Sequence, residues 1–292
     1  MRRRHRAALL PVDRGLQARM VLAMLLTPAV AVGGLAAAIA FGPDWLAFGL
    51  VIVVGAGVFS RLRRDDEPPP ERPSVSAHQR PELHAAVDRL CLLADLSKPE
   101  IVIEYENHPN SWVEPPSRDR PARLHLTAAL IGLLSSAELE AVIAHELSHL
   151  AHHDARVLAA VGASGALLLD GAKRGPCCMW GGIAAALVLG WVSRLGTLML
   201  ARHRELVADA ASASLTGRPV ALASALRRIS GELALVPSVD LRTAAARDAL
   251  HLVAVDAREL FRPLVLRTHP PLGRRIERLE RLERAMHDAR PS

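Results

Sequence analysis

Two long apolar stretches near the N-terminus constrain the fold of this chain more than any other feature. Residues 20–41 form an apolar run long enough to cross the hydrocarbon core of a bilayer, about 30 Å, as a helix. A second run, residues 45–60, follows directly after Gly42-Pro43-Asp44. We therefore predict a transmembrane hairpin with basic flanks over residues 1–64. The alternative is a cleaved signal peptide ending near Ala38-Ile39-Ala40, which the length of the first run and the presence of the second disfavour.

Arginine residues set the predicted orientation of this hairpin. The turn between the two runs carries no positive residue, whereas both outer flanks do: Arg2, Arg3, Arg4, Arg6, Arg14 and Arg19 on one side, Arg61, Arg63 and Arg64 on the other. Because basic flanks are retained in the cytoplasm, both ends of the hairpin are predicted to be cytoplasmic. We expect a multi-pass protein of the cell (inner) membrane, in which the domain that follows the hairpin faces the cytoplasm.

The composition agrees with a membrane location. Of the 292 residues, 50% are hydrophobic and 3% aromatic, and the net charge of +6 is carried almost entirely by arginine, since Lys98 and Lys173 are the only lysines. A basic stripe with interleaved aromatic residues is absent from the sequence, so no nucleic-acid partner is predicted. The predicted partners are the lipid bilayer and a polypeptide.

A proline-rich segment, residues 65–80, is predicted to link the first hairpin to a second domain, residues 81–292. This domain is predicted to begin with a helix over residues 81–96, whose apolar residues recur with a helical period. It is predicted to end with a charged helix over residues 272–286.

A small sheet is predicted early in the second domain. Residues 101–105 and 122–126 have strand patterns, and a polar, proline-rich loop through Asn110, Ser111 and Trp112 separates them. Residues 127–134 are predicted to form a short helix. The sheet could hold an extended peptide along a strand edge, or be a purely structural hairpin, and the sequence leaves both uses open.

The segment His145-Glu146-Leu147-Ser148-His149 is an HExxH motif. Ser135 and Glu138 predict a capping box that starts the helix carrying it. Residues four apart lie on one helical face, so His145 and His149 can offer ring nitrogens to one metal ion. A zinc ion with three protein ligands keeps a water in its open position and lowers that water's pKa, and Glu146 can then take the proton as general base.

The third ligand must come from elsewhere in the chain. The metzincin extension of the motif is excluded, because His152 and Ala155 stand where it requires glycine and histidine. His152 and His153 would be poorly placed for a tetrahedron on the same helix as the first two ligands. We interpret them as solvated residues or as residues that support the ligands.

A second membrane hairpin is predicted over residues 157–200, approximately. The helix of the motif is expected to run without interruption from residue 136 to residue 169, and a second apolar arm covers residues 179–200. The first arm is short for a span, so a re-entrant pair or a buried helical hairpin are alternatives. Arg194, in the second arm, is expected to face protein or to reach an interface.

Glu205 and Asp209 lie four apart on a predicted helix beyond this hairpin, and so on one face. Two ligands of one metal lie on the same side of the membrane, and a hairpin satisfies this condition because it supplies two crossings. We predict Glu205 as the third ligand and Asp209 as the residue that fixes a histidine ring. A charged surface face is the alternative explanation of the pair.

Three motifs in order resemble the HtpX-type membrane zinc endopeptidases, which are gluzincins related to the CAAX prenyl protease. They are the HExxH motif followed by Asp154, the segment Arg204-Glu205-x-x-Ala208-Asp209, and Thr268-His269-Pro270-Pro271 before Arg275-Ile276. The resemblance covers roughly residues 80 to 280. It implies that His145, His149 and Glu205 bind one zinc ion and that Glu146 is the base. It also implies that Asp209 supports a ligand, that His269 stabilises the oxyanion and that Asn110 binds substrate.

The sequence departs from this family pattern at two places. Leu206 stands where the family usually has an aromatic residue, and the loop over residues 111–121 is charged and proline-rich. Both departures bear on substrate preference more than on catalysis. Three cysteines do not form a disulfide framework; Cys177 and Cys178 fall in the predicted outer loop, and their role stays open.

The predicted fold is mainly α with a small β-sheet, and combines integral membrane helices with a zincin-like metallopeptidase domain. The predicted function is a membrane-bound zinc metalloendopeptidase that hydrolyses membrane or misfolded proteins. The resemblance suggests membrane-protein quality control. The rival hypotheses are a non-catalytic zinc-binding sensor or scaffold, against which the intact Glu146 argues, and a helical membrane adaptor without metal.

Overall fold

The computed structural model describes residues 51–55, 72–117, 120–174, 180–233 and 269–288, with isolated positions 18, 22, 29, 33, 36 and 58. Most of the predicted first hairpin, the linker as far as residue 71, and Cys177 and Cys178 lie outside the described residues. The chain divides into two compact units. Of the described residues, those in 72–155 and from 202 onward belong to the first unit, and those in 14–71 and 156–201 to the second.

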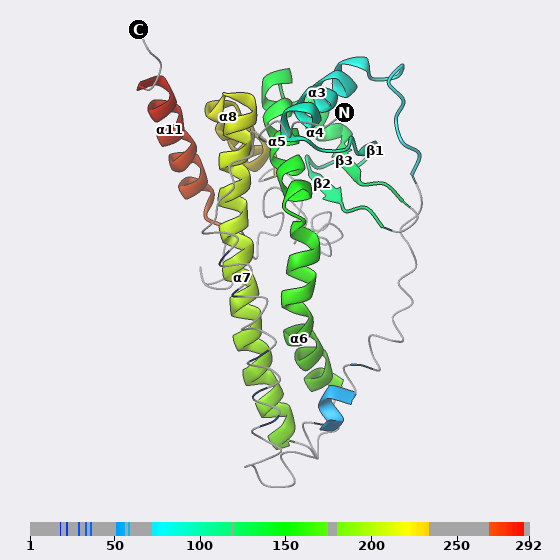
Figure 1. Cartoon of the computed structure of the whole chain (residues 1–292), viewed down its shortest axis with the longest axis vertical. Coiled ribbons are helices and arrows are strands. Elements are labelled where there is room, and N and C mark those ends of the chain that lie inside the picture. The colour runs from blue at the N-terminus through cyan, green and yellow to red at the C-terminus, as the bar shows by residue number, and fades with distance from the viewer. Residues whose placement is uncertain are drawn as a thin grey trace, which may run out of the picture. The chain divides into compact units, whose positions relative to one another are not determined.

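A three-stranded sheet in the first unit has the order β1-β3-β2 (Figure 1). β1 (Glu100–Glu104) runs parallel to β3 (Arg123–Thr127), and β2 (Ser111–Glu114) runs antiparallel to it. The two predicted strands are confirmed, but the prediction of a loop through Ser111 and Trp112 is wrong. The flanking prolines gave this short segment a loop signature, and its pairing with β3 overrides that local preference.

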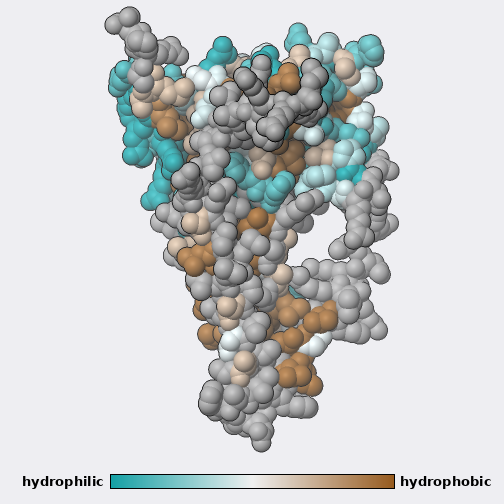
Figure 2. Space-filling view, in the orientation of Figure 1, coloured by the Kyte–Doolittle hydropathy of each residue, from teal (hydrophilic) through white to brown (hydrophobic). Residues whose placement is uncertain are grey.

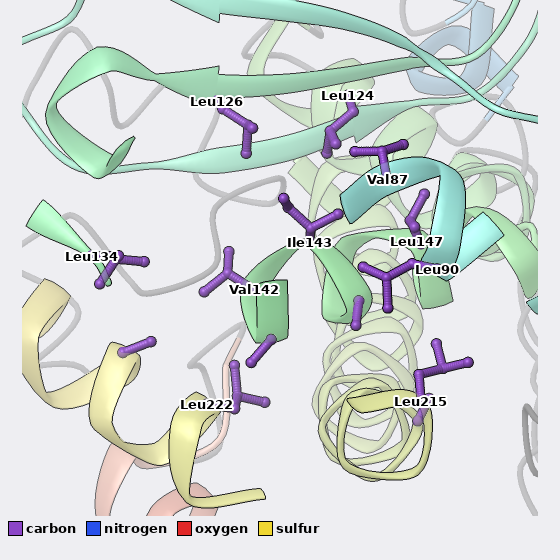
Figure 3. Close-up of a cluster of buried hydrophobic side chains, with 14 of the residues drawn as sticks. Val87, Leu90, Leu124, Leu126, Leu134, Val142, Ile143, Leu147, Leu215 and Leu222 are labelled. Atoms are coloured by element: carbon purple, nitrogen blue, oxygen red, sulfur yellow. The ribbon is translucent and has the colours of Figure 1, made fainter. Parts of the chain in front are cut away.

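Helix α5 (Ser136–Ala151) is the central helix of the first unit and contacts α3 (Pro81–Ala94), β2 and α8 (Pro219–Leu233). Its apolar residues Ile143 and Leu147 are fully buried, as are Leu124 and Leu126 of β3. Figure 3 shows these side chains with Leu90 of α3 and Leu222 of α8 in one cluster. Burying such a side chain contributes about 1.5–3 kcal/mol, so the metal-binding motif lies on a rigid core element.

The remaining helices of the first unit agree closely with prediction. α4 (Ala128–Leu133) follows β3 directly, and Thr127 caps its N-terminus by accepting from the Leu130 amide at 3.2 Å. α11 (Leu272–Asp288) packs against α8 and buries Leu279. Gly217, with a φ of 65°, occupies the left-handed conformation between the preceding helix and α8.

The predicted continuous helix over residues 136–169 is wrong, because α5 ends at Ala151 and α6 (Asp154–Arg174) begins as a separate helix. His152 terminates α5: its amide and its Nδ1 lie 3.1 Å and 2.8 Å from the Ser148 carbonyl oxygen. His153 then adopts a left-handed conformation, with a φ of 53°. A local side-chain contact to a helical carbonyl competes with the helical pattern, and periodicity of apolar residues does not reveal it.

In the second unit α6 packs closely against the N-terminal part of α7 (Trp180–Thr216). A Cβ added at Gly165 would lie 2.8 Å from the Ser193 Cβ, and one added at Gly190 would lie 2.8 Å from the Leu169 Cγ. The two helices therefore approach so closely that these positions admit only glycine. Small residues at a helix contact are typical of helix pairs in membranes.

Within the described ranges, one helix is long and apolar enough to cross a membrane, and it is part of α7, Ile183–Thr216. Five large apolar side chains on this helix are exposed: Leu187, Val188, Trp191, Val192 and Met199. Figure 2 shows hydrophobic surface in the lower part of the view. Arg194 is also exposed, with its guanidinium carbon 5.9 Å from the centre of the Trp191 ring. It does not face the protein, which was one of the two expectations for this residue.

Glu138 ties α5 to α8 and generates a prediction about stability. Its carboxylate accepts hydrogen bonds from the Ser135 amide at 2.8 Å, Ser224 Oγ at 2.6 Å and Arg228 Nη1 at 3.0 Å, so the predicted capping box is confirmed. Burial alone would raise the pKa of Glu138. The hydrogen bonds from Ser224 and Ser135 and the charge of Arg228 outweigh burial and hold this pKa below its ordinary value.

We expect Glu138→Gln to lower the free energy of unfolding by about 1–2 kcal/mol at pH 7. Because the folded-state pKa is lowered, the carboxylate stabilises the fold above its unfolded pKa of about 4.3, and this contribution is lost as the pH falls through the folded value. The difference between variant and wild type should therefore shrink in acid. Unfolding followed in detergent between pH 7 and pH 3 measures it, with Glu140→Gln on the same helix as the control. An equal difference at every pH would contradict the role assigned to the charge.

Candidate active site

Three side chains from two helices form the centre of the site. His145 and His149 lie one turn apart on α5, and Glu205 lies on α7. His145 is fully buried, Glu205 is 8% exposed and His149 is half-buried. The Nε2 atoms of the two histidines are 3.1 Å apart, and the Glu205 carboxylate lies 3.4 Å from His149 Nε2 and 3.8 Å from His145 Nε2.

These donors fit a zinc ion. Their ligand atoms all lie within 4.8 Å of one another, and in the described part of the chain they are the one such group of three or more that could hold a metal. Zinc ligands at about 2.0–2.1 Å in a tetrahedron are separated by roughly 3.3 Å, close to the 3.1 and 3.4 Å distances found here. Two imidazoles and one carboxylate are also the donor types that zinc prefers.

Asp209 lies one helical turn beyond Glu205 and is fully buried. Its Oδ1 is 3.1 Å from Nδ1 of His145, the ring nitrogen that faces away from the donor cluster. A carboxylate at this position fixes both the ring orientation and the tautomer of a histidine ligand. The structure thus brings the Asp209 carboxylate beside the ring of His145.

Arg275 of α11 is a residue whose role the sequence analysis missed. Its side chain is 2% exposed and donates to Asp209 from Nε at 2.9 Å and from Nη2 at 2.7 Å, and its Nη1 lies 3.2 Å from Glu205. Burial would lower the pKa of Arg275, but Asp209 and Glu205 outweigh burial and raise it. The signal was present, since Arg275 belongs to the third motif, but a motif does not say which carboxylate its arginine meets.

Glu146, next to His145 on α5, is 3% exposed and accepts a 2.8 Å hydrogen bond from Ser111 Oγ of β2. Burial raises the pKa of Glu146, and the opposing effects of His145, His149 and Ser111 do not cancel the rise. Ser111 was assigned to a loop and given no role by the sequence. Only the strand pairing shows that it reaches Glu146.

His269, just before α11, is 8% exposed, and its Nδ1 lies 3.3 Å from Glu205. Asn110 precedes β2. Its amide donates to Thr127 Oγ1 at 2.9 Å, and its carbonyl oxygen accepts from the Thr127 amide at 3.0 Å. The structure therefore brings His269 to the donor cluster and Asn110 to the start of the strand that contacts Glu146. His152 and His153 do not belong to the cluster of metal donors.

Comparison with known proteins identifies the family. Residues 77–283 match the family model described as Peptidase family M48. The chain belongs to peptidase family M48. The resemblance inferred from the sequence motifs is confirmed, and the protein is a metalloprotease.

Relatives within family M48 are similar along almost the whole chain. A protease HtpX homologue of Streptomyces coelicolor is 34% identical over 95% of this chain and 96% of its own. One from Moorella thermoacetica is 34% identical over 95% and 98%, and one from Methanosarcina mazei is 31% identical over 94% and 97%. Among solved structures, the crystal structure of S. mikatae Ste24p aligns with a TM-score of 0.49 and 17% identity, covering 91% of this chain and 67% of that one.

The buried arginine generates a prediction. We expect Arg275→Gln to destabilise the protein by about 3–5 kcal/mol, because two buried carboxylates lose the charge that compensates them. Metal content of the purified variant should fall as well, since Asp209 and Glu205 are no longer held. Arg274→Gln, at the exposed neighbouring position, is the control. Thermal unfolding and metal analysis are compared between the two variants. Equal unfolding temperatures and equal metal contents would contradict this assignment.

Proposed function

We propose that this metalloprotease is a zinc-dependent endopeptidase of the membrane, and that His145, His149 and Glu205 hold the ion, one per chain. The observation that carries the proposal is the convergence of these three donors beside the buried carboxylate of Glu146. In the described ranges no fourth protein donor joins the cluster. A structural zinc site is normally closed by four protein ligands, so this arrangement favours catalysis over a sensor or scaffold.

Glu146 is proposed as the general base and then the general acid of peptide hydrolysis. It would take a proton from the attacking water and deliver it to the nitrogen of the departing amine. Zinc, when bound, would polarise the scissile carbonyl group and make the attacking water more acidic. Burial raises the pKa of Glu146 above its ordinary value, which makes the carboxylate a stronger base.

Three further residues complete the proposed mechanism. Asp209 would hold the His145 ring in the orientation that presents Nε2 to the ion, and Arg275 would keep Asp209 and Glu205 charged and in place. His269, with Nδ1 near Glu205, would use its other ring nitrogen to donate to the negatively charged oxygen that develops on the substrate carbonyl.

The proposed substrate is an extended polypeptide, from a membrane protein or a misfolded protein. β2 is an edge strand of the described sheet, and its first residue touches Glu146. A peptide added to this edge by main-chain hydrogen bonds would therefore lie beside the base. Asn110, immediately before β2, is proposed to contact that peptide.

A multi-pass membrane location with the active site facing the cytoplasm is part of this proposal. Support comes from the exposed apolar side chains of α7, from the glycine contacts between α6 and α7, and from the arginine flanks of the N-terminal apolar runs. The crossing of the bilayer by the second hairpin, about residues 157–200, is proposed on the same grounds.

The catalytic proposal is tested by separating metal binding from turnover. We expect Glu146→Gln to keep about one zinc per chain and to lose casein cleavage in detergent by at least about 100-fold, because the ligands remain and the base is removed. Glu140→Gln, on the same helix but away from the cluster, is the matched control and should cleave normally. Cleavage by Glu146→Gln at the wild-type rate would exclude this base. Absence of zinc from the active wild type would exclude the proposed metal.

The topology is tested with cysteine labelling in intact cells. The native Cys177 and Cys178, in the predicted outer loop, should react with a membrane-impermeant maleimide. A Ser76→Cys variant that lacks both should react only after lysis. Cys91 provides a low background, since it is 4% exposed and burial raises the pKa of its thiol to about 11. Labelling at position 76 in intact cells would show that the orientation is the opposite of the one proposed.

A further inference from the structure

Ser111 connects the edge strand to the base. It is the first residue of β2 and is fully buried, and its hydroxyl donates a 2.8 Å hydrogen bond to Oε1 of Glu146 on α5. Glu146 is itself only 3% exposed. Because both groups are almost fully shielded from bulk solvent, the direct hydrogen bond between them fixes how the carboxylate lies.

The backbone around Ser111 is fixed on both sides. Ser111 pairs with Leu126 of β3, and the preceding residue, Asn110, donates its amide to Thr127 Oγ1 at 2.9 Å. The Thr127 amide returns a bond to the Asn110 carbonyl oxygen at 3.0 Å, and Thr127 also caps α4. The position of the Ser111 hydroxyl is therefore set by the sheet and not by a mobile loop.

The bond distinguishes the two oxygens of the carboxylate. Oε1 of Glu146 accepts from Ser111, whereas Oε2 accepts no hydrogen bond from the described residues. In the general-base step a proton passes from the attacking water to one carboxylate oxygen. The bond at Oε1 holds the carboxylate in one orientation. Oε2 is then the oxygen that receives the proton.

We propose that Ser111 is a positioning residue for the base, which holds Glu146 by one oxygen so that the other faces the attacking water. The proposal rests on the function proposed above for Glu146. Ser111 neither gives up nor gains a proton in this role. Its hydroxyl donates the same hydrogen bond before and after Glu146 is protonated, and the proton on Oε2 comes from water and leaves with the amine.

The test uses three substitutions at this position, in the full-length protein in detergent, with labelled casein as substrate. Ser111→Ala removes the hydroxyl. Ser111→Thr and Ser111→Val form a matched pair, because their side chains have nearly the same shape and only threonine keeps the hydroxyl. We expect the alanine and valine variants to lose about 10-fold in kcat with KM unchanged, and the threonine variant to keep most of the wild-type kcat. Zinc content should be the same in all four proteins.

Any of three kinetic results would overturn the positioning role while leaving the proposed function intact. One is a wild-type kcat in Ser111→Ala. The others are an equal loss in the threonine and valine variants and a loss found in KM alone, which would mean that Ser111 acts through packing or through substrate binding. If the wild-type protein cleaved nothing, the proposed function and the positioning role would fail together.

A stability measurement, which does not depend on turnover, tests the Ser111–Glu146 contact separately from the proposed function. Thermal unfolding of Ser111→Ala, Glu146→Ala and the double variant forms a cycle. We expect the loss in the double variant to be smaller than the sum of the single losses, because each single substitution already removes the shared hydrogen bond. Additive losses would show that the Ser111–Glu146 contact is absent, whatever the activity of the protein.

Discussion

The pairing of Arg275 with Asp209 is the contact on which the rest of the site depends. Both side chains are almost fully removed from solvent, and two hydrogen bonds of 2.9 and 2.7 Å join them. Buried charges are tolerated only when they compensate one another, and here one arginine compensates two carboxylates. Through Asp209 the guanidinium reaches His145, and through Glu205 it reaches the donor cluster. α11 is thereby part of the candidate site, although it contributes none of the three proposed donor atoms.

The sequence predicted most of the elements because their signals are local. The capping box at Ser135 and the helical period over residues 81–96 depend only on neighbouring residues. The two errors have non-local or competing causes. β2 forms because β3 lies beside it, and α5 ends because His152 contacts a helical carbonyl within an otherwise apolar pattern. Neither interaction leaves a periodic trace in the sequence.

The candidate site shows the same difference between local signals and contacts of distant residues. His145, Glu146 and His149 could be found from spacing on one helix, and Glu205 from spacing together with a topological condition. The links that hold these residues, from Arg275 to Asp209 and from Ser111 to Glu146, join segments separated by 66 and 35 positions. Sequence reasoning names residue types at fixed spacings, but it does not say which distant side chains meet. The supporting contacts of a site are therefore less predictable than its ligands.

The shortness of β2 has a consequence for what the enzyme selects. The strand has only four residues, Ser111–Glu114, and prolines at 109 and 115, which lack an amide hydrogen, flank it on both sides. Alternate residues of an edge strand point their amide and carbonyl groups outward, so about two residues of β2 can hold a peptide by its backbone. So few backbone hydrogen bonds would discriminate little between peptide sequences. Under the proposed strand addition the bound segment would have to be locally unfolded, so loss of structure, not a sequence motif, would be the property by which substrates are chosen.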